Sequence, residues 1–385
     1  QGLTQPRLGF TFDWSDTTTV HGGLGMYSGG SPNVWLSNTY SNDNTRQFGA
    51  YRGDWDLTTE TWVDCEAGVP VGPGWCIPQS VHDDVSGGTG SNFELNYLDP
   101  GFKIPSELKV ALGVTHIFGD DWTFGADLLW SRAEDPAMIK RGDFVETGTD
   151  AQGYPTYDDQ FFSGIPSFVL TNSDKNPESL VISLGLEKEF ENGFYFRVGY
   201  ANTDSEDVQP MTSSVAFSNY SNRAFFGPNE DVVSTSNYQI EHRFSAAARW
   251  TKELARDTEL TIALYGHANS GRPFSRVLPE DDSPYPWWYF FVGDNVLAPG
   301  EARNAHTGSW WRKVDARFTL DFPGFAPEHR ASAFLVIDNL TNLLNDDWGV
   351  LRQHAFPRTV LPGETEARIG DASRYEIRLG VEYDF

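Results

Sequence analysis

The chain has 385 residues and a formal net charge of −26, from 28 Lys and Arg against 54 Asp and Glu. This balance disfavours nucleic-acid binding, because a polyanion needs a basic protein face. No run of eighteen or more apolar residues occurs in the sequence, which excludes transmembrane helices. Gln1 opens the chain without the charged and apolar segments of a signal peptide, so we expect a processed or truncated start.

Apolar and polar residues alternate along nearly the whole chain, as in β-strands that have two different faces. A strand that crosses a membrane is only about 10 residues long and shows every second side chain to lipid, so its signal is this alternation. The sequence predicts eleven such strands: 5–14, 18–27, 108–115, 122–130, 180–187, 194–200, 238–250, 260–265, 314–322, 331–342 and 373–385. Segment 331–342 alternates least cleanly.

The last segment shows the two faces most clearly. One face carries only apolar and aromatic residues: Tyr375, Ile377, Leu379, Val381, Tyr383 and Phe385. The opposite face carries the charged residues Arg374, Glu376, Arg378, Glu382 and Asp384. A soluble sandwich could contain one such strand, but the repetition along the chain favours a membrane sheet.

The connections between these segments alternate strictly in length. Five are short (SDT, GDD, ENG, KELARDT and PGFAPEHR), and the others are long and rich in Gly, Pro, Asn and Asp: 28–103, 135–177, 203–235, 270–308 and 343–372. A transmembrane β-barrel has tight periplasmic turns at one rim and long extracellular loops at the other. The fold class predicted is therefore an all-β, transmembrane, antiparallel barrel in the outer membrane.

Aromatic residues cluster beside the short connections. Six lie within a few residues of one and on the apolar face: Trp14, Trp122, Phe190, Phe194, Trp250 and Phe322. Rings at a water–lipid boundary form such a girdle, although a single ring of this kind is more often a core anchor.

The strand count gives the direction of the chain. If the short turns are periplasmic, segment 373–385 runs inward and, ten strands earlier, segment 5–14 also runs inward. A natural barrel starts in the periplasm and has an even number of strands. We therefore expect residues 1–385 to be the C-terminal part of a longer barrel, with two unpaired edges.

The only two cysteines are Cys65 and Cys76, in the Gly- and Pro-rich stretch CEAGVPVGPGWC. No histidine or further cysteine lies nearby at metal-binding spacing. The pair therefore indicates a disulfide formed in an oxidising compartment.

The densest apolar segment outside the strands is the aromatic run Trp287, Trp288, Tyr289, Phe290 and Phe291. A large exposed apolar patch usually marks an interaction site, so this run is the candidate ligand-binding site. The alternative, in which these rings pack the loops together, is equally compatible with the sequence.

No other pattern indicates a catalytic, cofactor or metal site. The eight histidines form no metal-spaced pair, and the loop carboxylates Asp83-Asp84 and Asp346-Asp347 lack the spacing of a calcium cage. The glycines of GGLGMYSGG lack the helix that a dinucleotide site needs. No spacing suggests a nucleophile and its base, so we expect no enzyme.

Four segments resemble TonB-dependent receptors of the outer membrane, particularly the Oar-like group. They are TTVHGGLGMYSGGSPNVWLSNTYSN (18–42), SELKVALGVTHIFGDDWTFGADLLWSRAED (106–135), FLVIDNLTNLLN (334–345) and the terminal YEIRLGVEYDF. The resemblance covers most strands, but none of the long loops beyond the first residues of 28–103.

This resemblance implies a 22-stranded barrel of which about half lies here, with a plug domain and the N-terminal strands outside these residues. It implies contact with TonB through that plug, and a C-terminal signal, Tyr383 and Phe385, read by the barrel assembly machinery. Other expected partners are outer-membrane lipid, lipopolysaccharide and an unidentified extracellular ligand. The implied function is TonB-dependent ligand recognition and uptake. The alternatives are an Oar-like adhesion or export protein and a passive porin.

Overall fold

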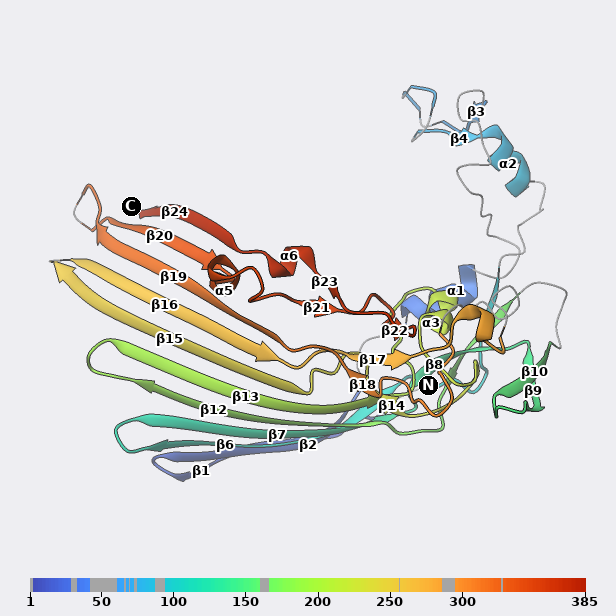
Figure 1. Cartoon of the computed structure of the whole chain (residues 1–385), viewed down its shortest axis with the longest axis horizontal. Coiled ribbons are helices and arrows are strands. Elements are labelled where there is room, and N and C mark those ends of the chain that lie inside the picture. Colours follow the sequence, from blue (N-terminus) through green and yellow to red (C-terminus); the bar gives the residue numbers. More distant parts are fainter. Residues whose placement is uncertain are drawn as a thin grey trace.

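The computed structural model describes residues 3–28, 33–41, 61–65, 67–68, 70–72, 75–86, 94–159, 166–255, 257–285, 295–326 and 328–385. These residues form one long antiparallel sheet with a folded body at one end (Figure 1). None of the helices among them is long and apolar enough to cross a membrane.

The main sheet is a meander in which each strand lies beside the next one in the chain. Its strands are β1 (Arg7–Ser15), β2 (Thr18–Tyr27), β6 (Ser106–Phe118), β7 (Trp122–Glu134), β12 (Glu178–Glu189), β13 (Phe194–Asp207), β15 (His242–Ala255), β16 (Thr258–Asn269), β19 (Trp311–Pro323), β20 (Arg330–Asp338) and β24 (Glu376–Asp384). A two-residue strand, β14 (Ser234–Thr235), pairs beside β13. All eleven predicted strands are present, so the alternation identified the fold correctly.

Two predicted strand ends extend four residues too far, whereas other strands run further than predicted, as β13 does to Asp207 rather than 200. Strand β15 begins at His242 rather than at 238, because Gln239 closes a turn onto the carbonyl of Ser236 and its side chain accepts from the Ser205 amide. Strand β20 ends at Asp338 rather than at 342. There Asn339 turns into the left-handed region (φ 55°), and its side chain accepts from the Asn342 amide.

The strand register places side chains of similar polarity next to one another across the sheet. Leu184 on β12 lies opposite Ala126 on β7 and Tyr200 on β13, whereas the neighbouring Ser183 lies opposite Asp127. Because side chains directly opposite one another share a face, the predicted apolar face is continuous across the strands. The polar face, called the polar wall below, is continuous on the other side.

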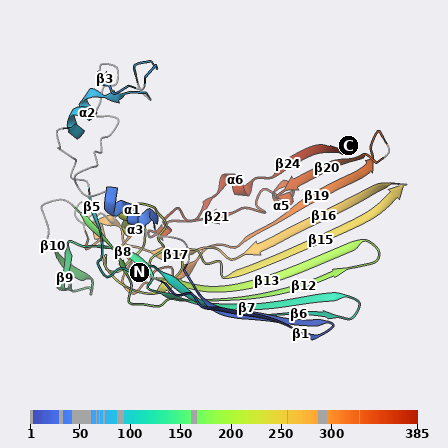
Figure 2. The same ribbon diagram turned by 180° about the vertical axis from the view of Figure 1, so that it is seen from behind.

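The sheet is open. Among the residues described, no strand pairs with the outer edge of β1 or of β24. Apolar side chains stand exposed on both, with Trp14 at 73% and Leu379 at 80%. These edges lie on opposite sides of the sheet (Figures 1 and 2).

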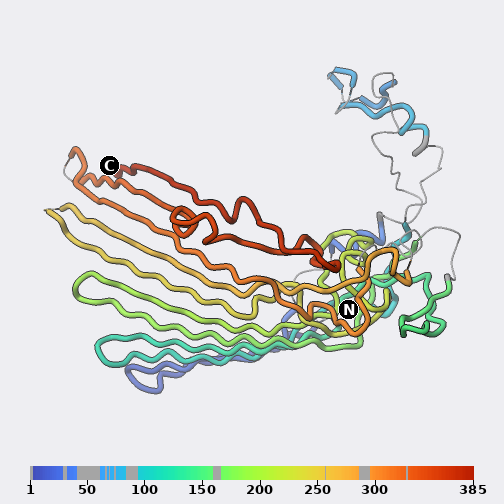
Figure 3. The backbone as a smooth tube through the Cα atoms, in the orientation of Figure 1, coloured from blue at the N-terminus to red at the C-terminus, as the bar shows by residue number. Residues whose placement is uncertain are grey.

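The short turns gather at one end of the sheet and the long connections at the other (Figure 3). Beside the short turns, the ring of Trp122 lies 6.0 Å from that of Phe190 and 5.9 Å from that of Phe196, measured between ring centres. Aromatic rings therefore form a belt on the apolar face at this end.

The long connections contain the remaining elements. Small sheets are formed by β5 (Leu95–Leu98), β11 (Ser167–Asn172) and β8 (Ala137–Arg141); by β9 (Phe144–Thr149) and β10 (Pro155–Asp159); by β18 (His306–Thr307), β17 (Pro273–Arg276) and β22 (Thr359–Val360); by β21 (Arg352–Gln353) and β23 (Ala367–Arg368); and by β3 (Trp62–Val63) and β4 (Ile77–Pro78). The helices are α1 (Asn33–Ser41), α2 (Gln79–Ser86), α3 (Ala216–Ser221), η2 (Glu280–Asp282), α5 (Leu340–Leu344) and α6 (Gly370–Ser373).

Most of these connections fold together as one unit. Its core is a cluster of buried residues drawn from four of the five: Phe102, Ala137, Ile139, Phe144, Tyr154, Phe168, Leu170, Ala216, Tyr220, Phe225, Tyr285 and Val296. We call this unit the loop body: α1, α3, β5, β8–β11, β17, β18 and β22 with the residues that join them.

Candidate ligand-facing site

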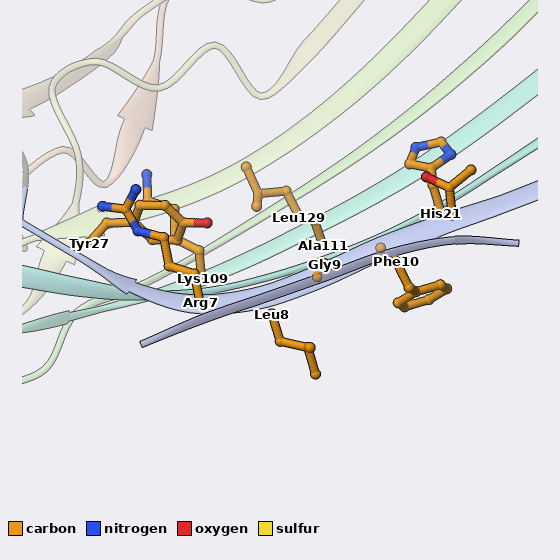
Figure 4. Close-up of a pocket in the computed structure, with 12 residues that line it drawn as sticks. Arg7, Leu8, Gly9, Phe10, His21, Tyr27, Lys109, Ala111 and Leu129 are labelled. Atoms are coloured by element: carbon orange, nitrogen blue, oxygen red, sulfur yellow. The ribbon is translucent and has the colours of Figure 1, made fainter. Parts of the chain in front are cut away.

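The polar wall begins at the β1 edge. There Leu8 and Phe10 leave one side of the sheet, and Arg7, His21, Tyr27, Lys109 and Leu129 leave the other (Figure 4). The Arg7 guanidinium carbon lies 4.4 Å from the ring centre of Tyr27, and Nε2 of His21 lies 3.1 Å from Oδ1 of Asp127. Polar side chains on this part of the wall thus contact one another across neighbouring strands, as in a water-filled interior.

Further along the wall the same holds for two arginines. Arg249 lies 2.9 Å from Glu189, and Arg197 lies 3.6 Å from Glu187, each distance joining a guanidinium nitrogen to a carboxylate oxygen. All four side chains are well exposed, so these pairs set the local charge of the wall but add little stability.

Between these charged residues, three glycines leave part of the polar wall without side chains. Gly125, Gly185 and Gly199 lie opposite one another on β7, β12 and β13. They floor a hollow of about 320 Å³, with Asp127 and Arg243 among its lining residues. A bulky group could therefore approach the backbone closely here.

The segment after β20 folds back onto β19. Oδ1 of Asp315 accepts from the Asn339 amide at 2.7 Å and from the Lys313 ammonium at 3.0 Å. The hydroxyl of Thr341 accepts from the Val314 amide at 3.4 Å. The motif DNLTNLLN is thus a structural junction that ends strand β20 and holds α5 against β19.

The loop body closes over the end of the sheet through hydrogen bonds between different connections. The hydroxyl of Tyr154 donates to the Leu297 carbonyl at 2.9 Å, and that of Tyr285 donates to the Pro155 carbonyl at 2.8 Å. The indole of Trp35 on α1 donates to a backbone carbonyl in the connection after β13. The loops therefore form a packed unit rather than separate strings.

Buried charges lie inside this unit. Arg141 pairs with Asp143, both nearly inaccessible to solvent, and Nη2 of Arg303 lies 2.6 Å from Oδ1 of Asp207. Burial lowers the pKa of Arg223. These groups are costly to bury, and removing a partner from such a pair leaves an uncompensated buried charge.

Burial also shifts the pKa of tyrosines in the loop body, in the direction that favours their neutral form. Burial raises the pKa of Tyr157 to about 12 and also raises the pKa of Tyr220 and Tyr285 above the ordinary value. These phenols are neutral at physiological pH: Tyr285 donates a hydrogen bond to the Pro155 carbonyl, whereas the fully buried Tyr220 packs in the core of the loop body.

The predicted ligand-binding run, Trp287 to Phe291, lies outside the described residues. Its two flanks are described and both are core residues: Tyr285 is 2% exposed and Val296 is 0% exposed. The sequence pattern did not identify these anchors, because a buried loop residue has no periodicity to distinguish it.

The other tryptophans that the sequence places in or beside the loops have separate surroundings. Trp75 is 54% exposed and Trp310 is 40% exposed. Trp311 lies on the polar wall, its ring centre 4.6 Å from that of His267. Among the described residues, these tryptophans do not form one joint platform.

Cys65 and Cys76 are joined by a disulfide. It closes a small unit with the pair β3–β4, in which the Gln79 amide donates to the Thr61 carbonyl at 2.7 Å. Mass spectrometry of protein taken from outer membranes under non-reducing conditions should find the two half-cystines in one linked peptide pair. The ring is short, so reduction should cost about 3 kcal/mol at most and only in local order. Free thiols in such a preparation would contradict the disulfide.

Tyr383 and Phe385 lie at the short-turn end. The Tyr383 hydroxyl accepts from the Phe325 amide at 2.9 Å, whereas the ring of Phe385 is 96% exposed. The role of this pair as an assembly signal remains a prediction from the resemblance. Within the described residues, no group of three or more His, Cys, Asp or Glu is placed to hold a metal ion.

An open meander with one apolar face, one polar face, short turns at one end and long connections at the other is the wall of a membrane-spanning β-barrel. The family model described as "Outer membrane beta barrel domain" matches residues 2–264. The chain belongs to this family of outer-membrane β-barrels. No curated protein matches the chain.

The chain is also similar to solved structures, and one of them supports the fold. The outer membrane transporter YddB from Escherichia coli matches with a TM-score of 0.53 and 13% identity, over 98% of this chain and 40% of its own. A mutant of the ferric enterobactin receptor PfeA from Pseudomonas aeruginosa matches with a TM-score of 0.46 and 10% identity, over 98% and 39%. The siderophore receptor PirA from Acinetobacter baumannii gives 0.46 and 10%, over 98% and 40%. The chain thus spans about two fifths of the length of each.

Proposed function

We propose that the chain is the ligand-recognising, C-terminal part of a TonB-dependent receptor barrel and takes part in uptake across the outer membrane. The observation that carries this proposal is the loop body. Long connections from successive hairpins are folded into one unit at a single end of a membrane wall, where an extracellular ligand would arrive first.

The strand directions support the larger barrel. Eleven alternating strands leave β1 and β24 running the same way, from the loop body to the short turns. A sheet that closes this one through antiparallel pairs must begin and end with strands of the opposite direction, so it has an odd number of strands. The total is then even, as in bacterial outer-membrane barrels. A second copy of this sheet would meet it only through parallel pairs.

The proposed ligand contacts are the run Trp287 to Phe291 and the polar wall beneath the loop body. Tyr285 and Val296, which flank this segment of the sequence on either side, are core residues of the loop body and support the choice of this run. Trp and Tyr bury large area at low rotamer cost, which suits binding sites. TonB would act through a plug domain, and the proposed role is transport without catalysis.

Replacing Trp287 and Trp288 by Ala in the complete receptor should weaken ligand binding or uptake while its surface abundance stays unchanged. The measurement is uptake per receptor, with abundance read by antibody on intact cells. Trp75→Ala, a change at an exposed tryptophan elsewhere, is the matched control and should leave uptake unaltered.

Four outcomes oppose this proposal. A collapse in abundance would assign the rings to loop packing, and unchanged uptake would place the site elsewhere. Solute flux that continues without TonB would instead favour the passive porin. Loss of cell adhesion with normal uptake would favour the Oar-like alternative.

A further inference from the structure

A chain of stacked aromatic rings lies on the apolar face just below the loop body. Its members are Tyr200, His242, Phe244 and Trp310. The ring centres of Tyr200 and Phe244 are 4.7 Å apart, those of His242 and Trp310 are 6.1 Å apart, and those of Phe244 and Trp310 are 6.2 Å apart. Phe244 and Trp310 remain 46% and 40% exposed. The rings therefore cover one another and still offer an outward surface.

This cluster marks the outer limit of the apolar band. The opposite belt includes Trp250, eight residues further along β15 than His242. At about 3.4 Å per residue the two levels are about 27 Å apart along the strand. A strand tilted by about 40° then spans about 21 Å of membrane between its aromatic belts, close to the apolar band of such barrels.

A positively charged residue, Arg312, lies in the same row of side chains across the sheet. Register places Tyr200 opposite Phe244, Phe244 opposite Ala268, and Ala268 opposite Arg312. The Arg312 guanidinium carbon lies 5.6 Å from the ring centre of Trp310. Arg312 is exposed, and no carboxylate in the described part of the chain forms an ion pair with it.

The side chains next to Arg312 on the side of the membrane centre are short. In the next row toward the membrane centre, Ala246 lies opposite Gly266, and Gly266 lies opposite Val314. No long side chain on this row competes for the space beneath the guanidinium. An acyl chain could therefore lie against the wall here while its headgroup stays at the level of the rings.

We propose that Arg312 and the aromatic cluster form a binding site for the phosphorylated headgroup of an outer-leaflet lipid. A planar guanidinium offers paired donors that match a phosphate, and rings of this kind settle at the boundary between headgroups and acyl chains. The site adjoins the part of the sheet that faces lipid. We therefore expect a membrane lipid, rather than a protein, to bind there. Because no described carboxylate forms an ion pair with Arg312, its charge is available to an anionic headgroup.

The test uses the protein as isolated from outer membranes in detergent, with diphosphorylated lipid A as the probe and native mass spectrometry as the readout. Arg312→Gln should reduce the bound fraction about tenfold, the loss expected when charge-assisted hydrogen bonds are removed. Arg317→Gln is the matched control, because Arg317 lies on the same strand but on the polar wall, where its Nε donates to Thr319. It should leave lipid binding unchanged.

Two further arms complete the test. Dephosphorylated lipid should bind weakly to the unaltered protein, and millimolar inorganic phosphate should not displace the lipid. Arg312→Lys, which keeps the charge but loses the paired donors, should bind to an intermediate extent and shows that the position tolerates change. Equal losses in Arg312→Gln and Arg317→Gln, equal binding of the dephosphorylated lipid, or displacement by free phosphate would overturn the proposal.

Discussion

Arginine at Leu184 should lower the stability of the membrane-inserted protein by about 2–4 kcal/mol, whereas arginine at the adjacent Ser183 should be tolerated. Leu184 lies near the middle of β12 on the apolar face, opposite Ala126 and Tyr200. A charge there must face hydrocarbon. Ser183 faces the polar wall beside Asp127, where a guanidinium can be hydrated and paired.

A second pair of neighbouring positions, on another strand, repeats the comparison. Phe318 and Thr319 on β19 stand in the same relation, with Phe318 opposite Leu335 on the apolar face. The measurement is the amount of folded protein in the outer membrane together with its denaturation midpoint in lipid vesicles. Equal damage at Ser183 and Leu184, and again at Thr319 and Phe318, would mean that both faces are buried and that the fold is soluble.

Asp143→Ala should destabilise the loop body by about 3–5 kcal/mol, because it leaves the Arg141 guanidinium buried without its carboxylate. The side chains of Arg141 and Asp143 are 3% and 1% exposed. Arg141 also lies 3.9 Å from the ring centre of Phe144, in the core of the loop body. Breaking the pair therefore loosens the packing between several connections.

Glu189→Ala is the matched control, since it removes the carboxylate of an exposed ion pair with Arg249 on the polar wall. It should cost at most about 1 kcal/mol. Hydrogen exchange of β8, β9 and β11, compared with that of β12 and β13, separates the two effects. If Asp143→Ala left the exchange of the loop strands unchanged, the loop body would not be a cooperative unit.

The strands of this protein could be predicted because lipid and water impose a period of two on every strand. Residues such as Leu184 and Ser183 reveal their faces from sequence alone. The end of β20 could not be predicted, because it depends on one left-handed residue, Asn339, and on the polar contacts of α5 with β19. These contacts involve residues far apart in the sequence.

The loop body was also hidden from sequence reasoning. Tyr220 and Phe225 are fully buried, yet the segment around them, SNYSNRAFFG, has no alternation of apolar and polar residues. The sequence indicated a rich aromatic run near residue 287, but the flanking anchors Tyr285 and Val296 emerge only when separate connections pack together. Likewise, the sequence does not reveal that Trp310 packs against His242 and Phe244 on β15, or that Arg312 lies opposite Ala268 on β16.

We propose that this sheet spans the outer membrane with the loop body outside and the short turns in the periplasm. Labelling of intact cells with a membrane-impermeant maleimide tests it most directly. The probes are a cysteine at Ala151, in the exposed turn between β9 and β10, and a cysteine at Asp120, in the short turn between β6 and β7. Ala151→Cys should react on intact cells, and Asp120→Cys should react only after the outer membrane is opened. Labelling of Asp120→Cys on intact cells, or protection of Ala151→Cys there, would contradict it.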